Sequence, residues 1–147
     1  MVTFFDPGPE LDGAGGQRLE RALGHALPGD YGAFLRSHNG GRPEPCYVPI
    51  PDFPGGIVDV QVLLGWGAKP QSSDIRWALP EVRARFPDDT LLPIAWDSSG
   101  NLFVLRFDDG RATAVEYADL LARPAEFHFV ALSFTAFVNS LRSVPYS

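Results

Sequence analysis

Cysteine, histidine and long apolar stretches are all scarce in this sequence. The single cysteine, Cys46, cannot close an internal disulfide, and its neighbours Pro45 and Tyr47 carry no positive charge that would lower the pKa of its thiol. No apolar run approaches the roughly 18 residues of a membrane-spanning helix. Residues 1–16 lack the basic segment and apolar core of a signal peptide. We therefore expect a cytoplasmic protein with no membrane partner and no disulfide.

Basic residues are also fewer than acidic residues. The chain of 147 residues has 12 Lys and Arg against 18 Asp and Glu, which gives a formal net charge of −6. Nucleic acid is therefore disfavoured as a partner, because binding to a polyanion begins from a basic surface. An acidic protein suits a basic partner, although negative charge also serves solubility. The length predicts one domain over 1–147, in which 1–16 form a loosely ordered leader rich in Pro and Gly.

Residues for catalysis occur in no recognisable arrangement. The three histidines are dispersed along the chain, and the sequence contains no glycine-rich phosphate loop. Ser98-Ser99-Gly100 precedes a predicted strand, whereas a nucleophile elbow needs glycines around its serine and a helix after it. Asp97, Asp108 and Asp109 lack the spacing of a calcium loop, and we interpret them as solvated turn residues. The sequence therefore predicts no catalytic residue, no metal ligand and no cofactor.

The strongest pattern in the sequence predicts three consecutive strands over about 91–117. The strands are expected at 91–96, 102–105 and 112–117. Turn-forming residues at 97–101 and 108–110 separate them, and Asp-Gly between apolar runs favours a hairpin. The middle run is apolar without alternation, which is typical of a strand buried on both faces. We expect an α+β fold, in which this meander is the centre of a mixed, largely antiparallel sheet with helices packed against it.

Periodic apolar residues predict helices before and after this meander. They are expected at 17–27, from Pro28 to the glycines at 40 and 41, at 74–86, and after the N-cap Ser133. Ser73 is the expected N-cap of the helix at 74–86, and Pro80 should kink that helix or divide it in two. Alternation over 57–64 predicts one half-buried strand.

Three segments share motifs with a known family. Residues 27–41 (LPGDYGAFLRSHNGG) begin a helix with Leu-Pro and end it with Asn-Gly-Gly. Residues 91–105 (LLPIAWDSSGNLFVL) place Pro-Ile before an acid, Gly-Asn and an apolar strand, and residues 129–141 (FVALSFTAFVNSL) introduce a helix with Ser-Phe. In this order the motifs resemble the SUKH superfamily over about 17–141. The residues that carry the resemblance are Pro28, Tyr31, Phe34, Asn39, Gly40, Gly41, Ile94, Gly100 and Asn101.

The resemblance implies an α+β fold and a function in binding. Bacterial members are similar to immunity proteins, which bind and neutralise a cognate toxin, often a nuclease, and related fungal members resemble regulators of cell-wall assembly. Neither branch is associated with catalysis. By this analogy we expect a non-catalytic immunity protein whose partner is a basic toxin domain. The alternatives are a regulatory scaffold without a toxin partner and, less favoured, a small-ligand sensor.

Two tryptophans are the candidates for partner binding, because tryptophan is enriched in interface hot spots. Trp66 lies between glycines in a predicted loop, and Trp77 lies off the apolar stripe of its helix; core packing is the alternative for both. Acids in or near the same part of the chain would form a rim that steers a basic partner toward them. These acids are Glu44, Asp52, Asp59 and Asp74.

Overall fold

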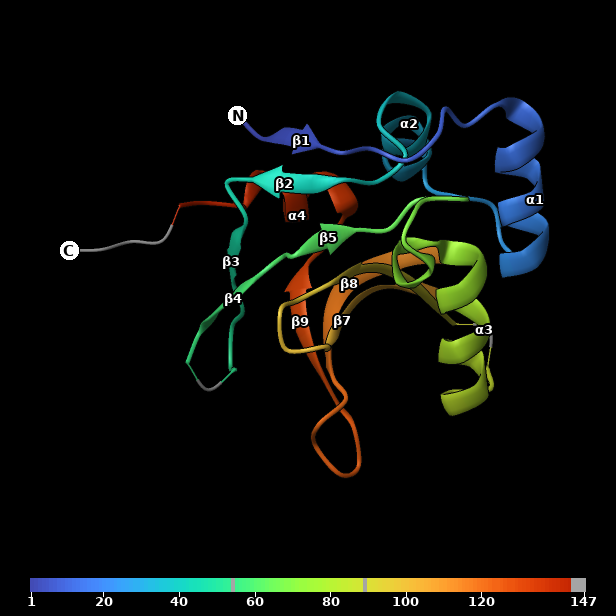
Figure 1. The fold of residues 1–147 in the computed structure, drawn as a ribbon. Helices are drawn as coiled ribbons and strands as arrows, with labels where there is room; N and C mark the ends of the chain where they lie inside the picture. Colours follow the sequence, from blue (N-terminus) through green and yellow to red (C-terminus); the bar gives the residue numbers. More distant parts are fainter. Residues whose placement is uncertain (54, 89, 144–147) are drawn as a thin grey trace.

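The computed structural model describes residues 1–53, 55–88 and 90–143, which form an α+β fold (Figure 1). A five-stranded sheet has the order β5-β6-β7-β8-β9, and β1-β2 and β3-β4 form two-stranded sheets. The strands of the large sheet are β5 (Val62–Leu63), β6 (Leu91–Trp96), β7 (Leu102–Asp108), β8 (Arg111–Asp119) and β9 (Glu126–Ala131). The expected fold class is confirmed. All strand pairs among the described residues are antiparallel, and one isolated parallel bridge joins Gly65 to Asp74.

The predicted meander is confirmed as β6, β7 and β8 at the centre of this sheet. Residues of β7 alternate between two apolar layers: Phe103 and Leu105 belong to the main core, whereas Leu102 and Val104 belong to a second cluster. Both faces of the strand are therefore buried, which explains why its apolar run shows no alternation. Pro93 lies beside a register shift between β6 and β7.

Ordered elements occupy the segment that was predicted to be a loosely ordered leader. β1 (Thr3–Phe5) pairs antiparallel with β2 (Arg42–Glu44), which is distant in sequence. The ring of Phe4 packs edge-on against Phe34, with ring centroids 4.9 Å apart. The sequence interpretation allowed for docking of the phenylalanines at 4 and 5, and Phe4 docks in this way. The backbone pairing of β1 with a strand distant in sequence was not predicted.

The first helix also begins earlier than the pattern of leucines indicates. α1 spans Gly13–Leu23 instead of 17–27. The carboxylate of Asp12 accepts a hydrogen bond of 2.7 Å from the Gly15 amide, so Asp12 is the N-cap. Gly24 ends the helix with a φ of 87°, the left-handed conformation that favours glycine.

The family segment around α2 (Gly29–Ser37) forms the expected helix with two changes at its ends. Pro28 is the N-cap rather than the first helical residue, with extended backbone angles. After the helix, Asn39 takes the left-handed conformation with a φ of 46°, and Gly40 follows at 93°. The aromatic stripe of the helix is buried as predicted, including Phe34, which is 8% exposed.

The alternating segment 57–64 forms two short strands, so the prediction of a single strand is wrong. β4 (Ile57–Asp59) pairs with β3 (Tyr47–Pro49), whereas β5 pairs with β6 in the large sheet. Between them, the amide of Gln61 donates to the Trp96 carbonyl at 2.8 Å. The chain changes its pairing partner within this segment, and local periodicity contains no signal for such a change.

α3 is one helix, Ile75–Arg85, with Pro80 inside it, so the alternative of two separate helices is wrong. A short 3-10 turn, η1 (Gln71–Ser73), precedes it, and Asp74 rather than Ser73 is the N-cap. Pro80 removes one backbone hydrogen bond of the helix, and one face of the helix is buried around it. The helix residues buried on this face are Ile75, Ala78, Leu79 and Val82.

The last part of the chain contains a strand that the sequence interpretation missed and a helix that it predicted. β9 pairs with β8 and forms the edge of the large sheet. α4 (Phe134–Asn139) follows, and the Ser133 hydroxyl caps it by accepting from the Ala136 amide at 3.0 Å. Phe134 and Phe137 of this helix are buried in the main core, as predicted.

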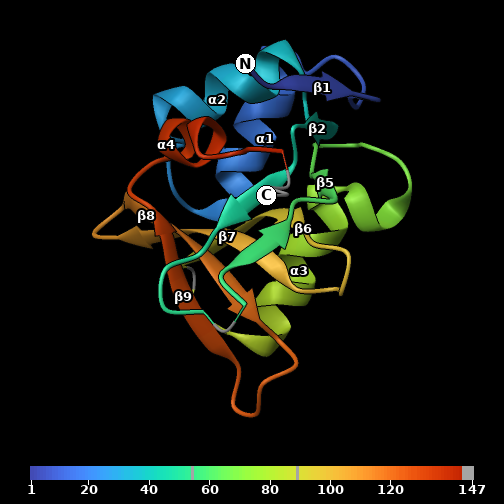
Figure 2. The same cartoon turned by 90° about the vertical axis from the view of Figure 1, so that its left-hand side faces the viewer.

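The large sheet is covered on both sides. α3 lies on one side and the β3–β4 hairpin on the other (Figure 1), and α1, α2 and α4 gather at the upper end of the sheet (Figure 2). An edge-on contact between the rings of Tyr31 and Phe134, 4.9 Å apart, joins α2 to α4. Among the helices of the described residues, none combines the length and apolar character needed to cross a lipid bilayer.

Candidate functional site

A cleft of about 790 Å³ opens between the β3–β4 hairpin, the turn from β6 to β7, and the loop that follows β8. The hairpin lies in front of the large sheet in Figure 2, and its inner residues form one wall. Two apolar lining residues, Ile57 and Leu121, are 37% and 70% exposed. We call this site the acidic cleft, and its lining residues are Tyr47, Phe53, Ile57, Val58, Asp59, Asp97, Ser98, Ser99, Asn101, Tyr117, Asp119, Leu121 and Ala122.

The acidic cleft carries negative charge without a counter-charge in its lining. Asp59, Asp97 and Asp119 line it, and no described residue in the lining is a lysine, arginine or histidine. The Oδ1 atom of Asp59 accepts from the amide and hydroxyl of Ser98, at 3.1 and 2.9 Å. The Oδ1 atom of Asp119 accepts from the Leu121 amide at 3.1 Å. In each case Oδ2 has no hydrogen-bond partner among the described residues and is available to a ligand.

A buried hydrogen-bond network fixes the shape of the cleft. Asp97 is 5% exposed, and its carboxylate accepts from the Asn101 amide at 2.8 Å and from the Tyr117 hydroxyl. Asn101 donates to the Tyr117 hydroxyl at 2.9 Å and accepts from the Leu120 amide at 2.8 Å. The network therefore ties the β6–β7 turn to β8 and to the loop after it, so the two walls of the cleft are held together.

The network also changes the acidity of Tyr117. Burial, and after it the hydrogen bond and negative charge of Asp97, raise the pKa of Tyr117 from 10.0 to about 12. Burial likewise raises the pKa of Tyr31 well above its ordinary value. Neither phenol ionises at neutral pH, so both act there as neutral groups.

We expect the free energy of unfolding to fall as the pH rises from about 10 to about 12. Tyr117 ionises near 10.0 when unfolded and near 12 when folded, so in this interval the unfolded chain binds fewer protons and is favoured by rising pH. Urea unfolding at several alkaline pH values measures the slope. In Tyr117→Phe the free energy of unfolding should fall less steeply with pH between about 10 and 12. The matched variant Tyr31→Phe should retain the pH dependence that Tyr117 contributes. Equal slopes in wild type and Tyr117→Phe would contradict the assignment.

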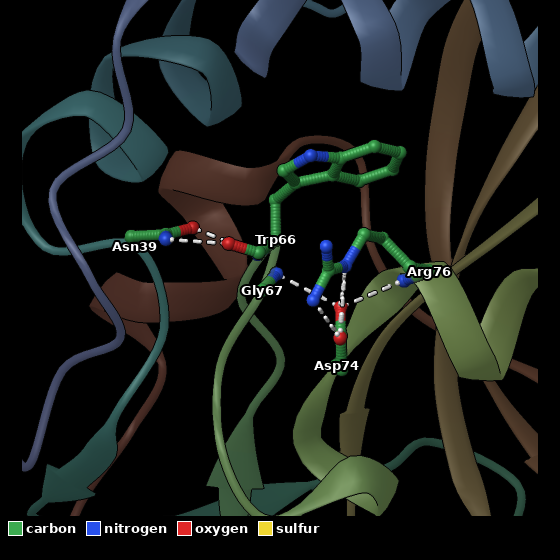
Figure 3. Close-up of polar contacts among 5 residues, drawn as sticks. All are labelled: Asn39, Trp66, Gly67, Asp74 and Arg76. Carbon is green, nitrogen blue, oxygen red and sulfur yellow. Dashed lines mark hydrogen bonds and ion pairs between the residues drawn. The ribbon is translucent and has the colours of Figure 1, made fainter.

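The two tryptophans predicted to bind a partner do not line the acidic cleft. Both are half-buried and pack against the main core. The backbone of Trp66 is held by the side chain of Asn39, which accepts from the Trp66 amide at 2.9 Å and donates to its carbonyl at 3.0 Å (Figure 3). The indole of Trp66 lies beside the guanidinium of Arg76, in an apolar groove whose other basic residue is Arg83.

Asp74 belongs to the scaffold and not to an open acidic rim around the tryptophans. It is 7% exposed, and its Oδ1 accepts from the amides of Gly67 and Arg76 at 2.8 and 3.0 Å (Figure 3). Its Oδ2 lies 2.9 Å from Nη2 of Arg76, which neutralises its charge. The carboxylate therefore caps α3 and fastens the loop before it.

One of the other three predicted acids lines the acidic cleft, and two do not. Asp59 is a lining residue, Asp52 is exposed between β3 and β4, and Glu44 is exposed on β2. Burial, and then the charges of Glu44 and Asp59, raise the pKa of the Cys46 thiol. The thiolate is thus disfavoured, in agreement with the unreactive role predicted for this cysteine.

Sequence reasoning missed several residues of the cleft. Asp97 was interpreted as a solvated turn residue, but it is buried and accepts hydrogen bonds from three residues. Tyr117 and Asp119 lie at the end of β8, and only the antiparallel pairing of β7 with β8 places them beside the β6–β7 turn. The available signal was the family motif itself, which keeps an acid and a Gly-Asn pair together in that turn.

The structure thus defines an α+β protein whose antiparallel sheet carries an acidic cleft. The chain belongs to the SMI1 / KNR4 family (SUKH-1), whose family profile matches residues 17–140. It is also 29% identical over 143 residues to the SPbeta prophage-derived uncharacterized protein YokK of Bacillus subtilis (strain 168), a match that covers 88% of this chain and 73% of YokK. The resemblance to the SUKH superfamily is therefore confirmed, and that superfamily includes immunity proteins.

Proposed function

We propose that this protein is an immunity protein that binds a basic toxin domain through the acidic cleft. The observation that carries the proposal is that two carboxylates and two exposed aliphatic side chains line the same cleft. The carboxylates are Asp59 and Asp119, each with one oxygen that has no partner among the described residues, and the aliphatic side chains are Ile57 and Leu121. This combination fits an arginine or lysine, because the charged head pairs with a carboxylate while the aliphatic stem packs on apolar surface. The net charge of −6 would also speed the approach of a basic partner.

The proposed mechanism is stoichiometric occlusion without catalysis. The toxin is held in a complex that covers the surface it uses to act, and a stable complex of this kind typically buries about 1,600 Å² in total. The cleft supplies its central anchor, and the rigid network of Asp97, Asn101 and Tyr117 keeps that anchor formed before binding. Such a protein works in the cytoplasm of the cell that makes the toxin.

Co-expression with candidate toxins tests this proposal. Toxin domains encoded beside the gene are expressed with and without this protein, and the rescue of growth is measured together with capture of the complex from purified components. The proposal requires that one such domain is both bound and neutralised. Failure of every neighbouring basic domain to bind, with the protein folded, would contradict it.

The volume of the cleft, about 790 Å³, is also within the range of small-ligand sites. This observation supports the alternative of a ligand sensor. A sensor would show a shift in thermal unfolding with small cationic metabolites and no toxin neutralisation. A regulatory scaffold, the second alternative, would bind a partner protein but give no rescue of growth.

A further inference from the structure

A second cluster of ionisable side chains lies where β8 and β9 separate. In the register of the two strands Asp119 faces Glu126, and Tyr117 faces His128. Because side chains two residues apart share a face of a strand, Asp119, Glu126 and His128 project on the same side of the sheet. One potential ligand atom from each lies within 4.8 Å of the other two.

His128 is the residue of this cluster that has a buried nitrogen without a hydrogen-bond partner among the described residues. Its side chain is 14% exposed, but its Nε2 atom is shut off from solvent and has no hydrogen-bond partner among the described residues. Nε2 lies 3.6 Å from Oε1 of Glu126, so the unpaired nitrogen faces the carboxylate of the cluster. The imidazole packs against the ring of Phe53 in a T-shaped arrangement, with centroids 5.0 Å apart, which limits its rotation. An unsatisfied buried nitrogen carries a cost that a metal ion would remove.

The two carboxylates complete a donor set. Asp119 is oriented by hydrogen bonds from the Leu121 and Ala122 amides to its Oδ1, at 3.1 and 3.3 Å. Its Oδ2 has no hydrogen-bond partner in the part of the chain that the structure describes. Glu126 is 63% exposed, so its side chain can adjust to an ion without disturbing the core. Backbone amides thus position Asp119 on β8, whereas Glu126 on β9 can adjust. The pairing of β8 with β9 fixes the spacing of the two residues.

We propose that Asp119, Glu126 and His128 bind a divalent transition-metal ion, with Zn²⁺ as the ion that fits best. One imidazole nitrogen and two carboxylate oxygens are ordinary zinc ligands, at distances of about 2.0–2.2 Å. The imidazole selects against Ca²⁺ and Mg²⁺, which prefer oxygen ligands throughout. Three protein ligands leave a fourth position for water or for a group of a partner. Since Asp119 also lines the acidic cleft, the ion would lie at the edge of that cleft and would compete with a cationic group of a partner for Oδ2 of Asp119.

Calorimetric titration of ZnCl₂ into the metal-free full-length chain, with any affinity tag removed, tests this site. We expect one saturable site per chain, and a fall in affinity of more than about tenfold in each of His128→Gln, Glu126→Gln and Asp119→Asn, since even residues that only orient a ligand contribute about 10–100-fold. Exposed His38, which is not in the cluster, provides the matched control His38→Gln, whose affinity should equal that of wild type.

The visible absorption of bound Co²⁺ gives an independent readout, since its intensity reports the coordination geometry and should be lost in the same three variants. Absence of saturable Zn²⁺ binding, or binding that survives all three substitutions, would overturn the proposal. Glu126 is largely exposed, so Glu126→Gln keeps the test decisive if a variant at His128 fails to fold. Because Zn²⁺ is titrated in the absence of a toxin, failure here leaves the proposed immunity function standing, and the reverse also holds.

Discussion

Gly65→Ala should destabilise the fold by about 3 kcal/mol or more, above the usual range for a small overpacking change. A Cβ at this position would lie 2.1 Å from the Asn39 carbonyl oxygen and 2.9 Å from the carbonyl carbon. These are backbone atoms that cannot rotate away. The carbonyl oxygen of Asn39 also accepts from the Gly8 amide at 3.0 Å, and the Gly65 amide donates to the Ser73 carbonyl at 3.0 Å. Hydrogen bonds therefore hold the backbone in place at both Asn39 and Gly65.

Gly16→Ala is the matched control for this substitution. Gly16 lies in α1, and a Cβ there would meet no atom within 4 Å apart from its chain neighbours and the backbone of its own helix. Since glycine weakens a helix interior, this variant should be more stable than wild type by about 0.5–1 kcal/mol. Urea unfolding measures both variants through the midpoint and slope of the transition. An unfolding midpoint for Gly65→Ala equal to that of wild type would show that the backbones of Gly65 and Asn39 can move apart to admit a Cβ, and would contradict the prediction.

Neutralising the acidic cleft should weaken binding to the toxin partner by roughly 30-fold for each of Asp59→Asn and Asp119→Asn. The estimate follows from about 2 kcal/mol for removing one member of a buried charge pair. Asparagine keeps the side-chain oxygen that accepts from neighbouring amides, so the walls of the cleft should remain in place. Surface plasmon resonance against the toxin domain identified by co-expression measures the affinity and both rate constants. This expectation rests on the proposed immunity function.

Asp109→Asn separates the role of the cleft from the effect of net charge. Asp109 is exposed in the β7–β8 turn, at the opposite end of β7 from the acidic cleft, and its φ of 51° is tolerated by asparagine. The variant loses the same charge and should change the affinity less than about threefold, through the association rate alone. An equal loss of affinity in Asp109→Asn and Asp59→Asn would mean that only the overall charge matters.

Local chemistry was sufficient to predict the meander, α2 and α4. The turn residues between β6 and β7, the Asp-Gly turn after β7 and the serine cap of α4 each act within a few residues, so the sequence displays them directly. The strand β9 was missed because Phe129 is exposed while Val130 and Ala131 are buried, across a register shift against β8. Alternation is therefore broken within the strand.

The site was less accessible to prediction than the fold, because it depends on contacts between distant segments. The sequence indicated that Asn39 ends a helix, but its side chain also forms two hydrogen bonds with the backbone of Trp66. Trp66, a predicted interface residue, is therefore held in place by the scaffold. Asp74 looked like a free acid, yet Arg76 neutralises it. The cleft joins β4, the β6–β7 turn and the end of β8. The pairing of β7 with β8 brings the last two together, and hydrogen bonds from Ser98 to Asp59 link β4 to the turn.

Hydrogen–deuterium exchange of the protein with and without its toxin partner tests the central claim most directly. If the acidic cleft is the binding surface, the amides of the β3–β4 hairpin, the turn at 97–101 and the loop at 119–122 gain protection, while those of α3 do not. Protection confined to Trp66, Arg76 and the neighbouring groove would instead place the partner on the other side of the sheet and contradict the account.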